Sequence, residues 1–107
     1  MSKFWKFEGA KNDFIVLDRL GKSLLTPKRV VELCRRHQGI GANGVLSVRP
    51  GTLCSVEMVV QNSDGSIAGM CGNGIRCVFD AIWRGFFPWI SLDPSASLDI
   101  QVGKRVF

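Results

Sequence analysis

The pattern of hydrophobic and polar positions predicts a strand-rich chain with two helices. The apolar run at residues 14–17, which Asp18 closes, is typical of a buried strand. Residues 45–48 and 56–61 predict two more strands, and the alternation over residues 98–102 predicts another. With one further strand before residues 14–17, the expected order is strand, strand, helix, strand, strand, helix, strand. This order predicts a mixed α/β (α+β) fold in one domain that spans residues 1–107.

The first predicted helix has a start signal and a stop signal. Thr26 is a suitable N-cap, and Pro27 fits the first helical position, where its missing N–H costs nothing. Basic residues 35–37 are expected in the last turn, next to the negative end of the helix dipole, and Gly39 ends the helix. The apolar stripe, which places Cys34 in the core, consists of Val30, Leu33, Cys34 and His37.

The second predicted helix begins near Gly72 and directly follows a cysteine. Cys71 precedes the sequence Gly-Asn-Gly, at a helix start where unpaired backbone N–H groups and the helix dipole favour a thiolate. Glycines there leave room for a ligand to approach the backbone, and the N–H groups can bind a carboxylate. Cys71 is therefore a candidate base or nucleophile, and the alternative is a structural cysteine beside a turn. Cys77, further along the helix, is expected in the core.

Composition and charge exclude several classes of protein. The net charge is +5, but the basic residues are dispersed, and their densest cluster, residues 28–36, is expected on the solvated face of the first helix. We therefore predict no nucleic-acid partner. No apolar run approaches the roughly 18–20 residues of a membrane span, and residues 1–13 lack a signal-peptide core, so we predict a cytoplasmic protein without a membrane partner.

Neither the four cysteines nor the glycine-rich segment predicts a metal or nucleotide site. The cysteines match no common zinc spacing, so free thiols are expected rather than disulfides or a metal site. Residues 39–44 match the G-x-G-x-x-G letters of a dinucleotide site. That motif requires a strand before it and a helix after it, whereas here the predicted order is reversed. These glycines therefore predict a tight helix-to-strand turn and no bound cofactor.

Four sequence blocks together point to a known family. They are residues 6–18 (KFEGAKNDFIVLD), 33–46 (LCRRHQGIGANGVL), 61–66 (QNSDGS) and 70–77 (MCGNGIRC). In this order and spacing the chain resembles the N-terminal half of the diaminopimelate epimerases, which are cofactor-independent amino-acid epimerases. The resemblance implies a curved, mostly antiparallel sheet or partial barrel around one central helix, that of residues 73–84. The resemblance also implies that the epimerase acts in the synthesis of lysine and of a cell-wall precursor.

The resemblance implies roles for five residues. Cys71 would be one of two cysteine acid/bases that flank the substrate α-carbon and exchange its proton without pyridoxal phosphate or a metal. Asn12 and Asn62 would contact a diaminopimelate-like amino acid, and turn formation is the alternative role for both. Gly72 and Asn73 would offer backbone N–H groups to the α-carboxylate.

The chain departs from the family pattern in two respects. Asn43 stands where the family usually has Asp, which is either a tolerated turn residue or a lost contact. The C-terminal half, with the second catalytic cysteine, has no counterpart here. Three hypotheses follow: a lobe inactive alone, a half-enzyme completed by a homodimer or partner chain, or a non-catalytic module that binds a small carboxylate. The aromatic segment 86–90, which is hard to bury in one lobe, favours a homodimer.

Overall fold

The described part of the chain forms two helices and seven strands. The computed structural model describes residues 4–9, 12–36, 39–69, 72–91 and 98–107. Two short strands, β5 and β7, add to the predicted order. Neither described helix is long and apolar enough to cross a membrane. The elements are β1 (Phe4–Gly9), β2 (Asn12–Asp18), α1 (Pro27–Cys34), β3 (Gly44–Pro50), β4 (Val56–Asn62), β5 (Ile67–Ala68), α2 (Gly72–Trp83), β6 (Ile100–Val102) and β7 (Arg105–Val106).

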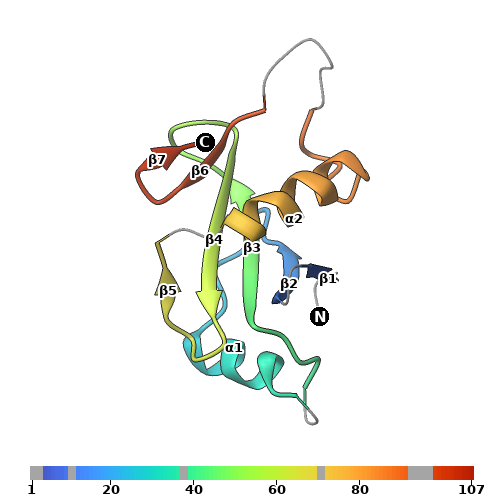
Figure 1. Ribbon diagram of the computed structural model, residues 1–107. Helices are drawn as coiled ribbons and strands as arrows, with labels where there is room; N and C mark the ends of the chain where they lie inside the picture. Colours follow the sequence, from blue (N-terminus) through green and yellow to red (C-terminus); the bar gives the residue numbers. More distant parts are fainter. Residues whose placement is uncertain (1–3, 10–11, 37–38, 70–71, 92–97) are drawn as a thin grey trace.

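The strands form one open, mixed sheet. Their order is β1-β2-β3-β4-β6-β7, and β5 pairs with β4 beside this path. The β2–β3 and β4–β6 pairs are parallel, and the other pairs are antiparallel. The predicted mostly antiparallel sheet is therefore confirmed, and it does not close into a barrel, since β1 and β7 lie at opposite ends of the strand order (Figure 1).

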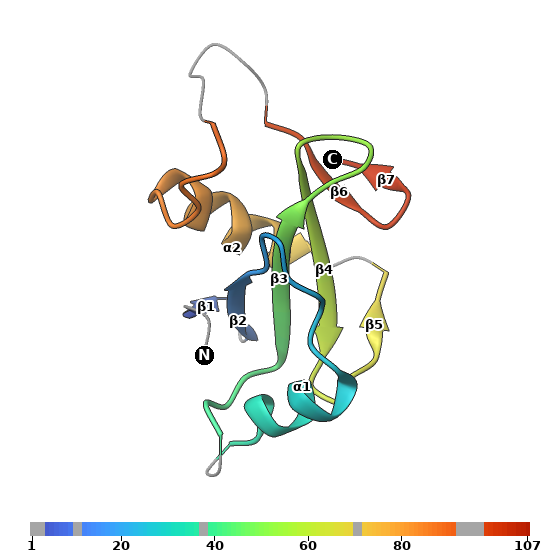
Figure 2. The same cartoon turned by 180° about the vertical axis from the view of Figure 1, so that it is seen from behind.

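The two faces of the sheet carry separate apolar clusters because alternate residues of a strand point to opposite faces. In β2, Phe14 and Val16 belong to the larger cluster, which α2 covers with Val78 and Ile82. Ile15 belongs to the smaller cluster under α1. Both faces of β2 are buried, which explains why residues 14–17 read as a continuous apolar run. Figure 2 shows α1 near the end of the sheet where β4 stops, with β6 and β7 at the other end.

Helix α2 has the predicted bounds, but its last residue faces solvent. The helix runs from Gly72 to Trp83, and Trp83 is 65% exposed. Gly85, at φ +80°, ends the helix, and the N–H of Phe86 donates to the carbonyl of Ala81 at 3.1 Å. This left-handed glycine turns the chain back towards the sheet.

The aromatic segment after α2 is largely folded onto the core. Phe87 is 2% exposed and Ile90 is 9% exposed. Phe86 stacks on Trp5 of β1 with ring centroids 4.6 Å apart, and Phe87 meets the same indole edge-on at 5.5 Å. The premise that residues 86–90 form an exposed patch is therefore wrong, and this segment no longer supports a homodimer. The homodimer itself stays a prediction.

Helix α1 starts where the sequence predicts and ends earlier. The Thr26 hydroxyl accepts a hydrogen bond from the N–H of Arg29 at 3.2 Å, which confirms the cap. The helix ends at Cys34 because Arg35 is extended (ψ 128°), so the prediction that Arg35 and Arg36 belong to its last turn is wrong. The N–H groups of Gly41 and Ala42 instead satisfy the carbonyls of the final turn, at 3.0 and 3.2 Å. His37 lies outside the described residues.

Candidate functional site

Three strand ends meet at one edge of the sheet and bring two of the predicted site positions together. β2 begins at Asn12, β3 begins at Gly44 and β4 ends at Asn62. Because β2 and β3 are parallel and β4 is antiparallel to β3, these ends share one edge, with Phe14 opposite Gly44 and Gly44 opposite Asn62. Gly44 allows close strand approach here, since a Cβ would lie 2.7 Å from the carbonyl oxygen of Gln61.

Asn62 stands at the tip of the β4–β5 hairpin with an exposed side chain. Its N–H donates to the carbonyl of Ser66 at 2.8 Å, and its side-chain amide donates to the Ser66 hydroxyl at 3.1 Å. Asp64 accepts hydrogen bonds from the hydroxyl and N–H of Ser66, which lowers the pKa of that carboxyl. Gly65, at φ +89°, packs against Pro27 of α1. Asn62 therefore forms the turn and also presents an amide at this edge.

The start of α2 carries two of the predicted site positions, Gly72 and Asn73. Gly72 is exposed, and a Cβ there would meet no atom of the described residues within 4 Å, so their packing does not require this glycine. Asn73 is half-buried and Gly74 is buried. Cys71 lies outside the described residues, and its role stays a prediction.

An ion-pair cluster beside Asn12 was missed from the sequence. The guanidinium of Arg36 binds both carboxylate oxygens of Asp13 at 2.8 Å, and the Lys6 ammonium lies 3.5 Å from the same group. The hydrogen bonds from Arg36, and then its charge, lower the pKa of Asp13 from 3.8 to about 2 despite burial. Both partners belong to the family-like blocks but lie 23 residues apart, so no local pattern pairs them.

Of the other cysteines, Cys34 lies in the core as predicted, whereas Cys77, also predicted in the core, is only half-buried. Cys34 is 4% exposed in the cluster under α1, and burial, followed by the charge of Asp13, raises the pKa of its thiol. Cys54 is half-buried and its thiol donates to the carbonyl of Val56 at 3.2 Å. Cys77 is half-buried against the α2 cluster. These three form no disulfide with one another. Within the described ranges, no three His, Cys, Asp or Glu side chains gather as metal ligands.

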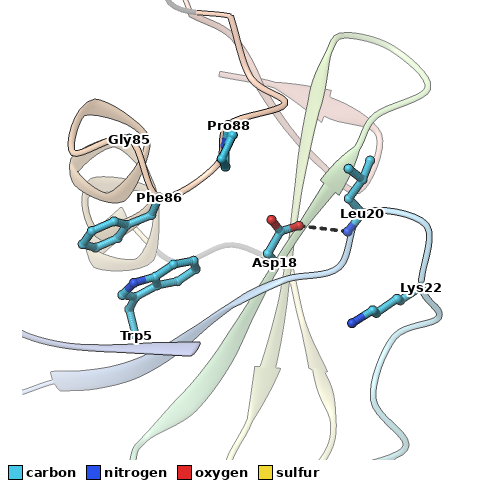
Figure 3. Close-up of a pocket in the computed structure, with 7 residues that line it drawn as sticks. All are labelled: Trp5, Asp18, Leu20, Lys22, Gly85, Phe86 and Pro88. Atoms are coloured by element: carbon cyan, nitrogen blue, oxygen red, sulfur yellow. Dashed lines mark hydrogen bonds between the residues drawn. The ribbon is translucent and has the colours of Figure 1, made fainter. Parts of the chain in front are cut away.

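A cavity of about 610 Å³ lies at the opposite end of β2 from Asn12 (Figure 3). The carboxylate of Asp18, on its wall, accepts hydrogen bonds from the N–H of Leu20 and from the indole of Trp89, both at 3.0 Å. That carboxylate therefore fastens the aromatic segment to β2, and the cavity is separate from the predicted site. Its lining residues are Trp5, Asp18, Leu20, Lys22, Gly85, Phe86 and Pro88.

Comparison with known proteins agrees with the four blocks. The family model described as diaminopimelate epimerase matches residues 4–89. The chain belongs to the diaminopimelate epimerase family. The diaminopimelate epimerase of Clostridium perfringens is 51% identical over 98% of this chain, and that of Gloeothece citriformis is 49% identical over 71% of it. The aligned parts make up 39% and 28% of those two epimerases, so the chain spans well under half of the relatives it matches.

Proposed function

We propose that this chain provides one lobe of a cofactor-independent epimerase that acts on a diaminopimelate-like amino acid. The observation that carries the proposal is family membership together with an α-helix that begins at Gly72, directly after Cys71. The open space at Gly72 supports it, because a substrate carboxylate can approach the backbone N–H groups there. Residues 1–107 would act as a single domain.

In the proposed reaction Cys71 is one of two acid/bases. Its thiolate removes the α-proton and becomes a thiol, while a thiol on the opposite face of the carbanion gives up its proton and becomes a thiolate. The number of protons on the two thiols is unchanged, and the configuration of the α-carbon is inverted. Both thiols need pKa values near the working pH. Gly72 and Asn73 would bind the α-carboxylate, and Asn12 and Asn62 would contact polar groups of the substrate through their amides.

The second thiol must come from outside this lobe. Cys34 is the last residue of α1, Cys77 lies within α2, and Cys54 lies in the loop between β3 and β4. None of these settings resembles the helix start that follows Cys71. We therefore propose that a complementary lobe, or a second copy of this chain, supplies the opposing acid/base, and that a solitary lobe is inactive.

Substrate binding tests the proposal without requiring turnover. Diaminopimelate titrated into the isotopically labelled chain should shift the amide signals of Asn62 and of the first turn of α2. Pimelate, which has both carboxylates but no amino group, is the matched control and should bind more weakly. Shifts confined to the cavity beside Asp18, or no shifts, would refute the proposed site.

Deuterium exchange tests the chemistry. In D2O, a dimer or a complete two-lobe assembly should place deuterium at the α-carbon of diaminopimelate, and Cys71→Ser should abolish this exchange. Cys54→Ser is the control and should retain it. Light scattering shows which assembly is present. Exchange that survives in Cys71→Ser would exclude the acid/base role, and binding without exchange in every assembly would leave a non-catalytic binding module.

A further inference from the structure

Arg36 is not one of the proposed site residues, but its side chain joins β2 to the turn before β3. Its guanidinium donates to both oxygens of Asp13 at 2.8 Å and to the side-chain oxygen of Asn43, also at 2.8 Å. It lies in the turn that follows α1, where the chain has left the helix. A planar guanidinium holds two acceptors at fixed angles, so this contact constrains the geometry of both acceptors.

Asn43 continues the connection to the end of β4. Its N–H donates to the carbonyl of Asp13 at 2.9 Å and reaches the Asp13 carboxylate at 3.2 Å. Its carbonyl accepts a hydrogen bond from the N–H of Ser63 at 3.1 Å. Asp13 directly follows Asn12, and Ser63 directly follows Asn62. Hydrogen bonds therefore link Asp13 and Ser63, which are the chain neighbours of the two positions proposed to carry the substrate amides.

One member of this hydrogen-bond network, Asp13, is buried and can therefore fix the positions of the residues bonded to it. The Asp13 side chain is 12% exposed, whereas that of Arg36 is 53% exposed. Asp13 is thus a buried anchor in β2, and Arg36 and Asn43 tie the turn before β3 to it. The side-chain oxygen of Asn43 accepts a hydrogen bond from Arg36, and a carboxylate at this position would also be able to accept one.

We propose that Arg36 is a positioning residue that sets the separation of Asn12 and Asn62 through Asp13, Asn43 and Ser63. This proposal rests on the proposed function, since it assigns those two asparagines to substrate binding. Loss of the guanidinium would remove the side-chain contacts that join Asp13 to Asn43. Only main-chain hydrogen bonds would then hold the end of β4 relative to the start of β2, and the two amides would engage one substrate less precisely.

The test compares Arg36→Gln and Arg36→Lys with Arg29→Gln, which removes an exposed arginine paired with Glu32 on α1. In the ligand-free chain, Arg36→Gln should speed hydrogen exchange at the Ser63 amide by about tenfold, which is the usual effect of losing one charge-assisted hydrogen bond. Arg29→Gln should leave that rate unchanged. Unchanged exchange at Ser63 in Arg36→Gln, with the fold intact by thermal unfolding, would overturn the proposal.

Ligand binding separates a positioning role from a merely structural one. Diaminopimelate should bind Arg36→Gln about tenfold more weakly than the unmodified chain, and Arg36→Lys should recover part of the loss, since it restores the charge without the paired contact. Equal affinity in Arg36→Gln would overturn the positioning role even if Ser63 exchanges faster. If the unmodified chain binds no diaminopimelate, the proposed function fails and this role fails with it, while the Ser63 exchange rates still report whether the network exists.

Discussion

The Arg36–Asp13 ion pair should make the chain lose stability in acid, and an Asp13→Asn variant should not share that loss. The carboxylate is 12% exposed and accepts two hydrogen bonds from the guanidinium at 2.8 Å. Hydrogen bonding from Arg36, and then its charge, lowers the pKa of Asp13 from 3.8 to about 2. A carboxyl whose pKa is lower in the folded chain stabilises that chain only while it is ionised.

The size of the effect follows from the same shift. A fall from 3.8 to about 2 corresponds to at most about 2.4 kcal/mol at 1.36 kcal/mol per pKa unit. Arg36 is 53% exposed, so water and salt screen the pair, and about 1–2 kcal/mol is the expected contribution. It is fully present above about pH 5, declines as the pH falls through about 4, and is mostly gone by about pH 2.

Urea unfolding, followed by tryptophan fluorescence from about pH 6 to about pH 2, measures this contribution. The free energy of unfolding of the unmodified chain should exceed that of Asp13→Asn by about 1–2 kcal/mol at pH 6, and the difference should shrink towards zero in acid. Glu32→Gln, in the exposed pair with Arg29, is the control and should show a difference of about 0.5 kcal/mol or less. A difference for Asp13→Asn that is independent of pH would refute the reasoning.

Three further predictions concern reactivity and packing. Brief iodoacetamide treatment near neutral pH should label Cys71 first and Cys34 slowly, because Cys34 is buried and the pKa of its thiol is raised; mass mapping that finds Cys34 first would contradict this. Gly65→Ala, at φ +89°, should cost about 1–3 kcal/mol in urea unfolding, whereas Gly69→Ala, in open space, should cost little. Phe87→Ala should cost about 3–5 kcal/mol, and a near-neutral result would contradict its burial.

The sequence by itself determined the features that local chemistry controls. The bounds of α2 follow from the glycines that flank it and from the apolar stripe between them, and the start of α1 follows from Thr26 and Pro27. The apolar run at residues 14–17 correctly predicts a buried strand, because both faces of that strand are covered. The four sequence blocks were sufficient to identify the family, which the match over residues 4–89 confirms.

The tertiary structure alone decided what depends on distant partners. α1 ends at Cys34, where local signals favour a further turn, and Arg36 beyond it pairs with Asp13 in β2. The sequence predicts that the aromatic segment 86–90 is exposed. In the structure Trp5, some eighty residues earlier, stacks on Phe86. Two strand pairs, β2–β3 and β4–β6, are parallel, and no local sequence pattern predicts this pairing. The same holds for the sheet edge that Asn12 and Asn62 share. Each of these features depends on charge pairing or burial between residues far apart in the chain, and a local pattern of residues does not record such contacts.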